Sequence, residues 1–232
     1  MAVQSKKLVI AIDGPAASGK STTAKLVAER LGYLHVDTGA MYRAFTLKVL
    51  RSGISPDDRG NIARLLVSTR VTLRHTEKKL VVLLDGEDVT EQIRSVDVTR
   101  AVSSVSSLRE VRQAMVREQR AMGRNGGIVL EGRDIGTVVF PDADCKFFVI
   151  AGIEARAERR LKELREQGVD ADLDSLKNEI AERDRLDSTR FESPLRKADD
   201  AIEIDTSYMT IEEQVKVVEG KIRETLERRK RS

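Results

Sequence analysis

The fold of this chain is organised around twelve consecutive residues: Ile10-Ala11-Ile12-Asp13-Gly14-Pro15-Ala16-Ala17-Ser18-Gly19-Lys20-Ser21. This stretch fits the pattern Gly-x4-Gly-Lys-Ser, with an apolar run at 8–12 before it and a helical pattern after it. A phosphate-binding P-loop occurs in this context. Its glycines let backbone N–H groups point into one concavity, and the N-terminus of the following helix adds partial positive charge. The stretch therefore predicts a nucleoside triphosphate site.

The loop residues have separate expected roles. Lys20 is expected to place its ammonium between the β- and γ-phosphates, and the Ser21 hydroxyl to join the ligands of a bound Mg²⁺. A glycine-rich turn without any ligand is the alternative, but such a turn requires neither the lysine nor the serine. The expected triphosphate contacts are Gly14, Pro15, Ala16, Ala17, Ser18, Gly19, Lys20, Ser21 and Thr22.

The composition of the 232 residues argues against several other kinds of site. The one cysteine, Cys145, allows no intramolecular disulfide or cysteine zinc cluster, and we expect it to be buried. The only histidines are His35 and His75, and we expect both to be structural. The 41 basic and 38 acidic residues nearly cancel, which does not indicate a general nucleic-acid binder. Without a long apolar span or an apolar signal region, the chain is expected to be soluble and cytoplasmic.

The order of apolar runs and helical patterns predicts an α/β fold. Short runs at 8–12, 33–36, 128–130, 147–150 and 201–204 are typical of buried parallel strands. We expect a P-loop NTPase-like three-layer fold with a five-stranded parallel sheet, as a single domain over 1–232. From 65 to 104 the pattern alternates, with polar turns at 75–79 and at Asp85-Gly86, which predicts a small inserted antiparallel sheet. The inserted subdomain is expected at 38–124.

Two polar segments directly follow predicted strands. The segment 37–43 opens a helix with Asp37 or Thr38 as its cap, and Tyr42 and Arg43 either face the P-loop or form an exposed pair. Spacing alone does not decide between these alternatives. The segment 131–137 carries two acids and an arginine, which suit ligand contact at the carboxyl end of a strand.

Two further segments carry helix-capping patterns. Ser107-x-x-Glu110 predicts the start of a helix with Leu108, Val111, Met115 and Met122 on one face. Thr210-x-x-Glu213 predicts a last helix whose core-facing residues are Ile211, Val215, Val218, Ile222 and Leu226.

Arginines are densest at 154–190, where two helical patterns are joined by a glycine-containing turn. The first helix carries Arg156, Arg159, Arg160 and Arg165, and the second begins near Asp172. This layout predicts a lid that closes arginines over phosphates and expels water. The alternative, exposed helices with Glu–Arg ion pairs worth a few tenths of a kcal/mol each, covers some of these arginines.

The short chain, the early P-loop and the arginine-rich lid together favour phosphoryl transfer between small molecules. An acceptor phosphate is already ionised near neutral pH and needs no strong general base. The protein then has to align two polyanions and offset their repulsion, which arginine does through bidentate contacts. By analogy with arginine fingers, one such arginine contributes about 10³–10⁵ in rate.

Three segments together resemble the bacterial cytidylate kinases, a family of nucleoside monophosphate kinases. They are Asp37-Thr38-Gly39-Ala40-Met41-Tyr42-Arg43, the stretch from Glu131 to Ala143, and Glu182-Arg183-Asp184-Arg185-Leu186-Asp187 with Arg190. The middle stretch, with its Gly-Arg-Asp-x-Gly-Thr-Val-Val-Phe-Pro-Asp-Ala pattern, is more specific than the P-loop. The resemblance runs from the P-loop to the last helix. It also accounts for the insertion at about 65–104, because that family has an enlarged monophosphate-binding domain.

The resemblance implies transfer of the γ-phosphoryl group of ATP to CMP or dCMP, with Mg²⁺. The residues that it implies around the acceptor phosphate are Thr38, Tyr42, Arg43 and Arg133, where position 38 can also be Ser in the family. Those implied at the cytosine edge are Ser103, Arg112 and Asp134. Arg183, Asp187 and Arg190 would contact the sugar or phosphates, and Arg156 with Arg160 would belong to the ATP side of the lid. The implied catalytic residues are Lys20, Arg133, Arg156, Arg160, Arg183 and Arg190.

Two alternatives remain open at this point. One is a kinase for another small acceptor such as UMP, AMP or shikimate. The other is a nucleotide-dependent switch that uses the basic tail at 228–231 to contact RNA or a protein partner. The near-balanced charge and the predicted lid count against the second. We expect small-molecule partners, no nucleic acid, no membrane and a monomer.

Overall fold

The computed structural model describes residues 7–76, 80–166 and 168–231. The chain divides into two compact units, which are described separately. Unit 1 is formed by the described parts of Met1–Val36 and Met122–Ser232, and unit 2 by those of Asp37–Ala121.

The elements of unit 1 are β1 (Val9–Asp13), α1 (Lys20–Leu31), β2 (Leu34–Asp37, ending at the unit boundary), β6 (Ile128–Gly132), η2 (Ile135–Val139), β7 (Cys145–Ile150), α6 (Ile153–Glu166), α7 (Leu173–Thr189), β8 (Ile202–Asp205) and α8 (Ile211–Arg231).

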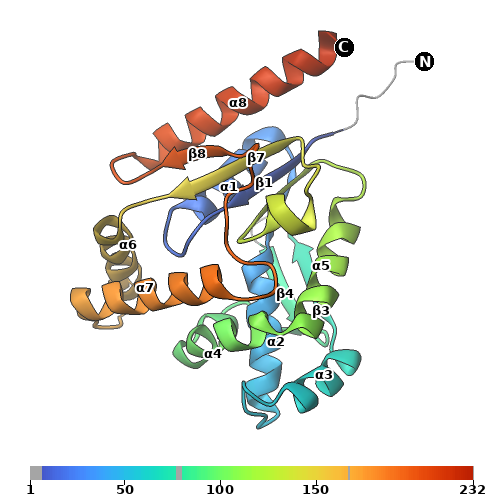
Figure 1. Cartoon of the computed structure of the whole chain (residues 1–232), viewed down its shortest axis with the longest axis vertical. Coiled ribbons are helices and arrows are strands. Elements are labelled where there is room, and N and C mark those ends of the chain that lie inside the picture. The colour runs from blue at the N-terminus through green and yellow to red at the C-terminus, as the bar shows by residue number, and fades with distance from the viewer. Residues whose placement is uncertain (1–6, 77–79, 167, 232) are drawn as a thin grey trace. The chain divides into compact units, whose positions relative to one another are not determined.

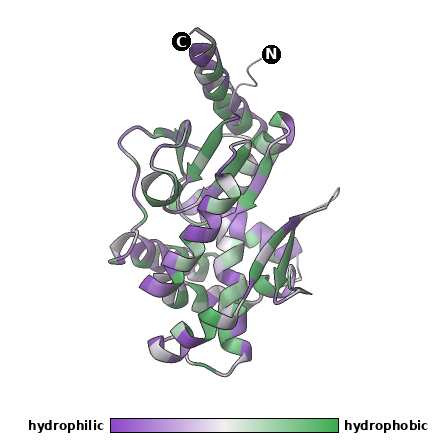
Figure 2. Ribbon diagram, turned by 90° about the vertical axis from the view of Figure 1, so that its right-hand side faces the viewer, coloured by the Kyte–Doolittle hydropathy of each residue, from purple (hydrophilic) through white to green (hydrophobic). Residues whose placement is uncertain are grey.

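Unit 1 is built on a five-stranded sheet in the order β2-β6-β1-β7-β8. Strand β1 lies in the middle and pairs in parallel with β6 and β7, and β7 pairs in parallel with β8. In this register Ile10 is opposite both Val129 and Cys145. The central strands β1 and β6 are almost entirely buried, as expected for strands that are covered on both faces, and green apolar residues run through the sheet in Figure 2. The expectation of burial is wrong for β8, which lies at the edge of the sheet and is mostly exposed. The predicted five-stranded parallel sheet is confirmed.

Helices α1 and α8 cover one part of this sheet with apolar side chains. Figure 1 shows α8 running along β8 and β7. The shared core holds Ile10, Val27, Phe147 and Val218, and Cys145 is buried in it as expected. Helix α1 ends at Leu31, with Gly32 as its C-cap in the left-handed conformation.

The start of α8 has the predicted capping box. The backbone N–H of Thr210 donates to Glu213 Oε2 at 2.8 Å, and the N–H of Glu213 donates to Thr210 Oγ1 at 3.3 Å. Val215, Val218 and Ile222 are buried as predicted. The prediction for Ile211 is wrong, because its residue is 49% exposed at the first turn, before the helix reaches the sheet.

Helices α6 and α7 pack side by side in Figure 1, around a small core of Ala157, Leu164, Leu176 and Ile180. The Asp172 carboxylate caps α7 by accepting a hydrogen bond from the Ser175 N–H at 2.8 Å. The two predicted helices are therefore confirmed, while their movement as a lid stays a prediction. Among the described residues, none of the helices is long and apolar enough to cross a membrane.

Unit 2 contains α2 (Thr38–Arg51), most of α5 and a small sheet. The Asp37 side chain accepts a hydrogen bond from the Ala40 N–H at 3.0 Å, so Asp37 rather than Thr38 caps α2. Met41, Ala44, Phe45 and Val49 form the buried apolar face of α2. The other elements are α3 (Arg59–Ser68), β3 (Val71–His75), β4 (Leu80–Leu84), β5 (Glu87–Asp88), η1 (Gln92–Arg94), α4 (Val96–Ser107) and α5 (Arg109–Gly123).

The antiparallel sheet of unit 2 is shorter than predicted. It runs β3-β4-β5, with Asp85-Gly86 as the turn between β4 and β5. Residues 65–68 belong to the end of α3, and 96–104 belong to α4, so the alternating pattern is wrong at both ends. Val98, Val102 and Val105 of α4 are buried at helical spacing, so the alternating pattern expected as far as 104 does not hold there. Strand β3 continues through His75, and the rest of the predicted polar turn, 77–79, lies outside the described residues.

The capping box predicted at Ser107 is absent. Ser107 is the last residue of α4, and its hydroxyl donates to the Ser104 carbonyl at 2.7 Å. The backbone N–H of Arg112 donates to the Leu108 carbonyl at 3.0 Å, which begins α5 one residue later than predicted. The pattern fails because the hydroxyl is used by the preceding helix.

Candidate active site

The P-loop joins β1 to α1 through backbone conformations that favour glycine. Gly14 has φ 153° and lies against the β7 backbone, where a Cβ would be 2.1 Å from the Val149 carbonyl oxygen. Gly19 has φ 88° and is the N-cap of α1. The two glycines therefore let the loop bend tightly enough to direct its N–H groups inward at the helix N-terminus.

Lys20 is placed over this loop. Its residue is only 6% exposed, and its Nζ donates to the Pro15 carbonyl at 2.9 Å. The loop is supported from β8, because Thr206 Oγ1 donates to the Ser18 carbonyl at 2.8 Å. A buried ammonium held over a ring of backbone N–H groups suits a polyphosphate.

A carboxylate on the neighbouring strand faces the first turn of α1. The Ser21 hydroxyl donates to Oε2 of Glu131, the fourth residue of β6. His35 Nε2, from β2, lies 3.1 Å from Oε1 of the same buried carboxylate. The sequence predicts ligand contact for the segment 131–137 but no separate role for Glu131, and it predicts a structural role for His35. An acid at the end of the strand beside the P-loop strand is the signal that identifies Glu131.

The donors here suit Mg²⁺. This ion prefers oxygen ligands and keeps several waters, so one hydroxyl and one carboxylate beside a polyphosphate form a fitting set. In the described parts of the chain, no three His, Cys, Asp or Glu residues gather to hold a metal ion by themselves. Ser21 and Glu131 would therefore hold the ion together with phosphate oxygens.

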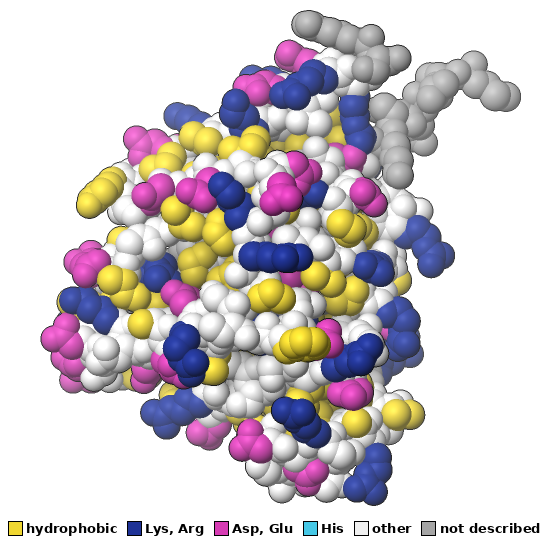
Figure 3. All heavy atoms as spheres, in the orientation of Figure 1, with side chains coloured by type: hydrophobic (Ala, Val, Ile, Leu, Met, Phe, Trp, Pro, Cys, Tyr) yellow, Lys and Arg dark blue, Asp and Glu magenta, His cyan; other side chains and the backbone are white. Residues whose placement is uncertain are grey.

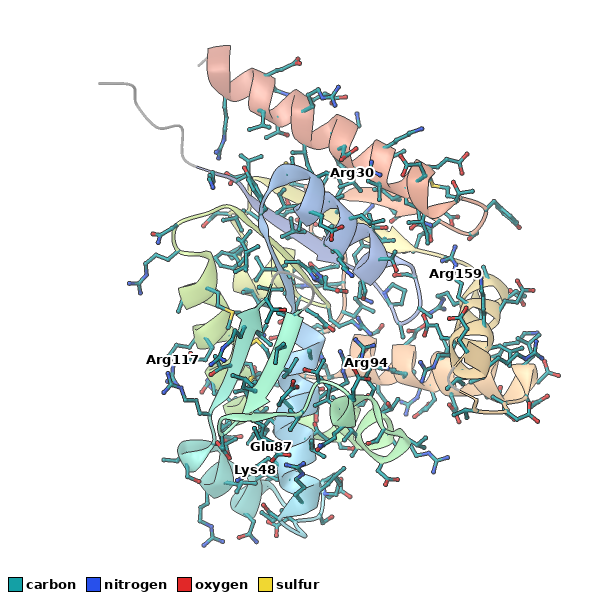
Figure 4. All side chains as sticks on the ribbon, turned by 180° about the vertical axis from the view of Figure 1, so that it is seen from behind. Arg30, Lys48, Glu87, Arg94, Arg117 and Arg159 are labelled. Carbon is teal, nitrogen blue, oxygen red and sulfur yellow. The ribbon has the colours of Figure 1, made fainter. Side chains whose placement is uncertain are left out.

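Two arginines of α6 reach the P-loop side of unit 1. Arg156 is buried, and its Nη1 lies 3.4 Å from the Ala16 carbonyl oxygen while it also pairs with Asp184 of α7. Arg159, labelled in Figure 4, donates through Nη2 to the Thr206 carbonyl at 2.5 Å. Arg159 was absent from the predicted set. No pattern in the sequence distinguishes Arg159 from the other arginines of α6. Only its contact with Thr206, the residue directly after β8, does so.

Arg160 behaves differently from Arg156. Its Nη1 donates to Glu163 of the same helix at 3.1 Å, an i,i+3 ion pair of the kind anticipated for the surface of α6. The structure thus places Arg156 at the P-loop, and Arg160 in a local pair.

A second group of residues in unit 1 brings two aspartates together with arginines from two segments of the chain. Arg133 Nε donates to Asp187 Oδ2 at 2.9 Å, and Arg190 Nη1 lies 3.6 Å from Asp187 Oδ1. Arg190 Nη2 lies 3.9 Å from Oδ1 of the buried Asp134. Burial alone would raise the pKa of Asp187, but Arg133, Arg183 and Arg190 lower it below its ordinary value. We call Arg133, Asp134, Arg183, Asp187 and Arg190 the acid–arginine group.

The acid–arginine group gives Asp187 a specific task. Its ionised carboxylate offsets part of the repulsion among the guanidinium groups, so that they can lie together. The remaining positive charge can then bind a phosphate. All five members were predicted from the sequence, and the structure brings them together.

Unit 2 holds its own group of predicted residues. Tyr42 is buried, so the alternative of an exposed pair is wrong for it. The Arg112 guanidinium carbon lies 5.2 Å from the centre of the Tyr42 ring, and its Nη1 donates to the Ser106 carbonyl at 3.2 Å. Arg43 pairs with Asp37 at 2.7 Å. Thr38 is buried at the start of α2, and Ser103 is half-buried on α4.

A family comparison and the relatives of the chain identify its class. The family model for cytidylate kinase matches residues 10–224. The chain is 51% identical over 223 residues to the cytidylate kinase of Bacillus pumilus, covering 96% of this chain and 97% of that protein. It is 52% identical over 206 residues to the cytidylate kinase of a Geobacillus strain, covering 89% and 92%. The chain belongs to the cytidylate kinase family.

A solved structure agrees with the fold of this cytidylate kinase family member. An uncharacterized protein from Eubacterium ventriosum matches with a TM-score of 0.52 at 12% identity, covering 94% of this chain and 99% of that one. The family match extends over the P-loop, the acid–arginine group and the unit 2 group. The resemblance seen in three motifs is thereby confirmed.

Proposed function

We propose that this member of the cytidylate kinase family transfers the γ-phosphoryl group of ATP to CMP and dCMP, giving CDP or dCDP and ADP. The observation that carries the proposal is the full-length family match, which includes a complete P-loop and both groups of predicted acceptor residues. The reaction takes place between two polyanions, so the protein must align them and offset their charge.

The P-loop of unit 1 forms the donor half. Its N–H groups and Lys20 hold the triphosphate. Ser21 and Glu131 would hold Mg²⁺, which would neutralise phosphate charge when bound. Arg156 is positioned by Asp184 beside the loop carbonyl of Ala16, where it can meet charge that develops on the transferring group.

Each unit, taken by itself, has residues that are proposed to contact the acceptor. In unit 1, Arg133, Arg183 and Arg190 hold the phosphate, while the buried Asp134 carboxylate accepts from the exocyclic amine of cytosine. In unit 2, Arg43 and Tyr42 hold the phosphate, and Arg112 with Ser103 donates to the cytosine ring. A uracil carbonyl in place of the amine would face the Asp134 carboxylate without a proton between them, so CMP is preferred over UMP.

No general base is required for this transfer, because the attacking oxygen of a monophosphate is ionised. Closure of α6 and α7 would bring further arginines to the phosphates and exclude water that would otherwise hydrolyse ATP. We place the reaction in the cytoplasm and in a monomer.

The deciding experiment is an acceptor panel with the purified full chain, ATP and Mg²⁺. CMP and dCMP should exceed UMP, AMP and shikimate in kcat/KM by about tenfold or more. A better acceptor outside the cytidine nucleotides would overturn the substrate assignment. Rapid ATP hydrolysis without any acceptor, together with salt-sensitive RNA binding, would favour the switch alternative instead.

A further inference from the structure

One buried carboxylate in unit 1 has no place in the chemistry described above. Asp13 is the last residue of β1 and is 4% exposed. Its Oδ1 accepts a hydrogen bond from the Ile135 N–H at 2.8 Å, and its Oδ2 accepts one from the Gly136 N–H at 2.7 Å. Both donors belong to the short π-helical turn η2, which lies 122 residues further along the chain.

These two bonds fix the start of η2. The first N–H groups of any helical turn have no partner within the turn, and the Asp13 carboxylate supplies one for two of them. The turn itself closes on Asp134, whose carbonyl accepts from the Val138 N–H at 2.9 Å. The backbone of Asp134 is thus held on its C-terminal side by Asp13. The approach is close, since a Cβ on Gly136 would lie 3.4 Å from Asp13 Oδ2.

We propose that Asp13 is a positioning residue, which holds the Arg133-Asp134 segment in the orientation that binds the acceptor nucleotide. The inference rests on the proposed function, in which Arg133 and Asp134 contact that nucleotide. Asp13 touches neither substrate. From the end of β1, directly before the P-loop, it holds the backbone next to the residues that are proposed to bind the acceptor.

The P-loop does not depend on this carboxylate to the same degree. Asp13 is held by its backbone between β6 and β7, opposite Gly132 and Phe148. Gly14 then packs on the Val149 carbonyl, and the loop is held again by Thr206 at Ser18. The η2 turn is not part of the sheet, so it lacks the strand pairing that holds the backbone of Asp13. A change at the Asp13 side chain should therefore affect the acceptor more than ATP.

Asparagine is the sharpest substitution at this position. It keeps the size of the side chain, but it replaces one acceptor oxygen with an NH₂ donor that faces a backbone N–H. One of the two bonds to η2 is then lost, and two donors are brought together. Asp144→Asn is the matched control, because Asp144 Oδ2 also accepts a hydrogen bond from β1, from the Val9 N–H at 2.7 Å, at the opposite end of the strand.

The test compares Asp13→Asn, Asp144→Asn and Asp134→Ala in the full chain. For Asp13→Asn we expect the KM for CMP to rise about tenfold and kcat to fall, with the Kd for ATP by calorimetry changing less than about twofold. Hydrogen exchange of a peptide over 133–140 should accelerate in Asp13→Asn and stay at the wild-type rate in Asp144→Asn. The control should lose stability while keeping its KM for CMP.

The outcomes separate the inference from the proposed function. A raised KM in Asp134→Ala together with a wild-type KM in Asp13→Asn overturns the role of Asp13 alone. A wild-type KM for CMP in Asp134→Ala overturns the acceptor site itself. Should Asp13→Asn not fold, Asp13→Glu takes its place, since its longer side chain keeps the charge but moves the carboxylate oxygens away from the two N–H groups of η2. An unchanged KM for CMP in a folded Asp13→Glu variant would equally overturn the inference.

Discussion

The Ser21 hydroxyl donates a hydrogen bond to the Glu131 carboxylate, which connects the first turn of α1 to the end of β6 across 110 residues. The second oxygen of that carboxylate lies 3.1 Å from His35 Nε2. The contact places an acid from a strand distant in sequence beside the P-loop serine. Glu131 is thus a second protein group for the proposed Mg²⁺ site, and His35 orients the carboxylate of Glu131.

Replacing Glu131 with Gln should weaken Mg²⁺ use. The amide carries no charge and donates on one side, so the Mg²⁺ concentration for half-maximal activity should rise about tenfold at fixed ATP. Binding of Mn²⁺ to the ATP complex, followed by electron paramagnetic resonance, should weaken in parallel. Glu163→Gln, whose carboxylate pairs with Arg160 of the same helix, is the control. Equal metal affinity in both variants would contradict the role of Glu131.

Replacing Lys20 with Ala should reduce kcat by about 10³-fold or more, because the ammonium that meets the β- and γ-phosphates is removed. Circular dichroism should show the fold intact. Lys48→Ala is the control, since Lys48, which is labelled in Figure 4, pairs with Asp85 in unit 2. Turnover that survives in Lys20→Ala would refute the P-loop role.

Replacing Asp134 with Ala should weaken discrimination among acceptors. Without the carboxylate that accepts from the cytosine amine, the KM for CMP should rise about tenfold or more, while the KM for ATP changes little. The ratio of kcat/KM for CMP and UMP should fall in the same variant. The exposed Asp142, changed to Ala, serves for comparison and should keep both KM values. A larger rise for ATP than for CMP would place Asp134 on the donor side instead.

Arg156 and Arg160, four residues apart on α6, form a matched pair. Arg156 reaches the Ala16 carbonyl and is held by Asp184, whereas Arg160 pairs with Glu163 of its own helix. Arg156→Ala should therefore lower kcat about 100-fold, and Arg160→Ala less than about threefold. Steady-state kinetics at saturating ATP and CMP measure both. A larger loss for Arg160 would mean that lid closure reorders the two arginines.

The buried Asp13 predicts a pH dependence of stability. Burial raises its pKa from 3.8 to about 7, although the two backbone N–H groups and Arg133 oppose the shift. The folded chain therefore holds this proton more tightly than the unfolded chain does. Its stabilising contribution is fully present below pH 3.8 and is lost as the pH rises through about 7.

Urea denaturation of the wild type and Asp13→Asn at about pH 5 and pH 8 measures this contribution. Asparagine does not titrate, so the free energy of unfolding of the variant relative to wild type should increase by about 2 kcal/mol over that interval. Asp144→Asn should show no comparable change. A constant difference between wild type and Asp13→Asn at both pH values would contradict the raised pKa.

Charge on the molecular surface agrees with the near-balanced composition. In Figure 3 the basic and acidic side chains are interspersed over the visible face and form no extended patch of one sign. The ion pairs of exposed side chains, such as Arg30 with Glu212, each contribute little to stability. Of the arginines proposed for function, Arg112 and Arg156 are buried, and Arg43, Arg133, Arg183 and Arg190 are half-buried.

Local sequence determined the β1–P-loop–α1 unit, the parallel sheet and the family motifs of this protein. In each case the deciding residues are neighbours in the chain: an apolar run, two glycines with Lys20 and Ser21, or a helical spacing of apolar residues. Such patterns report backbone preference and burial, which depend on adjacent residues. They failed for the valines of α4, which are buried at helical spacing, for the capping box at Ser107, whose hydroxyl bonds within α4, and for Ile211, which is exposed.

The tertiary structure alone decided which charges meet. Glu131 reaches Ser21 because β6 lies beside β1, and Arg133 reaches Asp187 across 54 residues. The same strand order brings Asp13 to the N–H groups of η2. No local pattern encodes these pairs, since they depend on the order of strands in the sheet and on the burial that makes each carboxylate require a partner. The P-loop could be read from twelve consecutive residues, while the carboxylate that accepts from its serine comes from β6, 110 residues away.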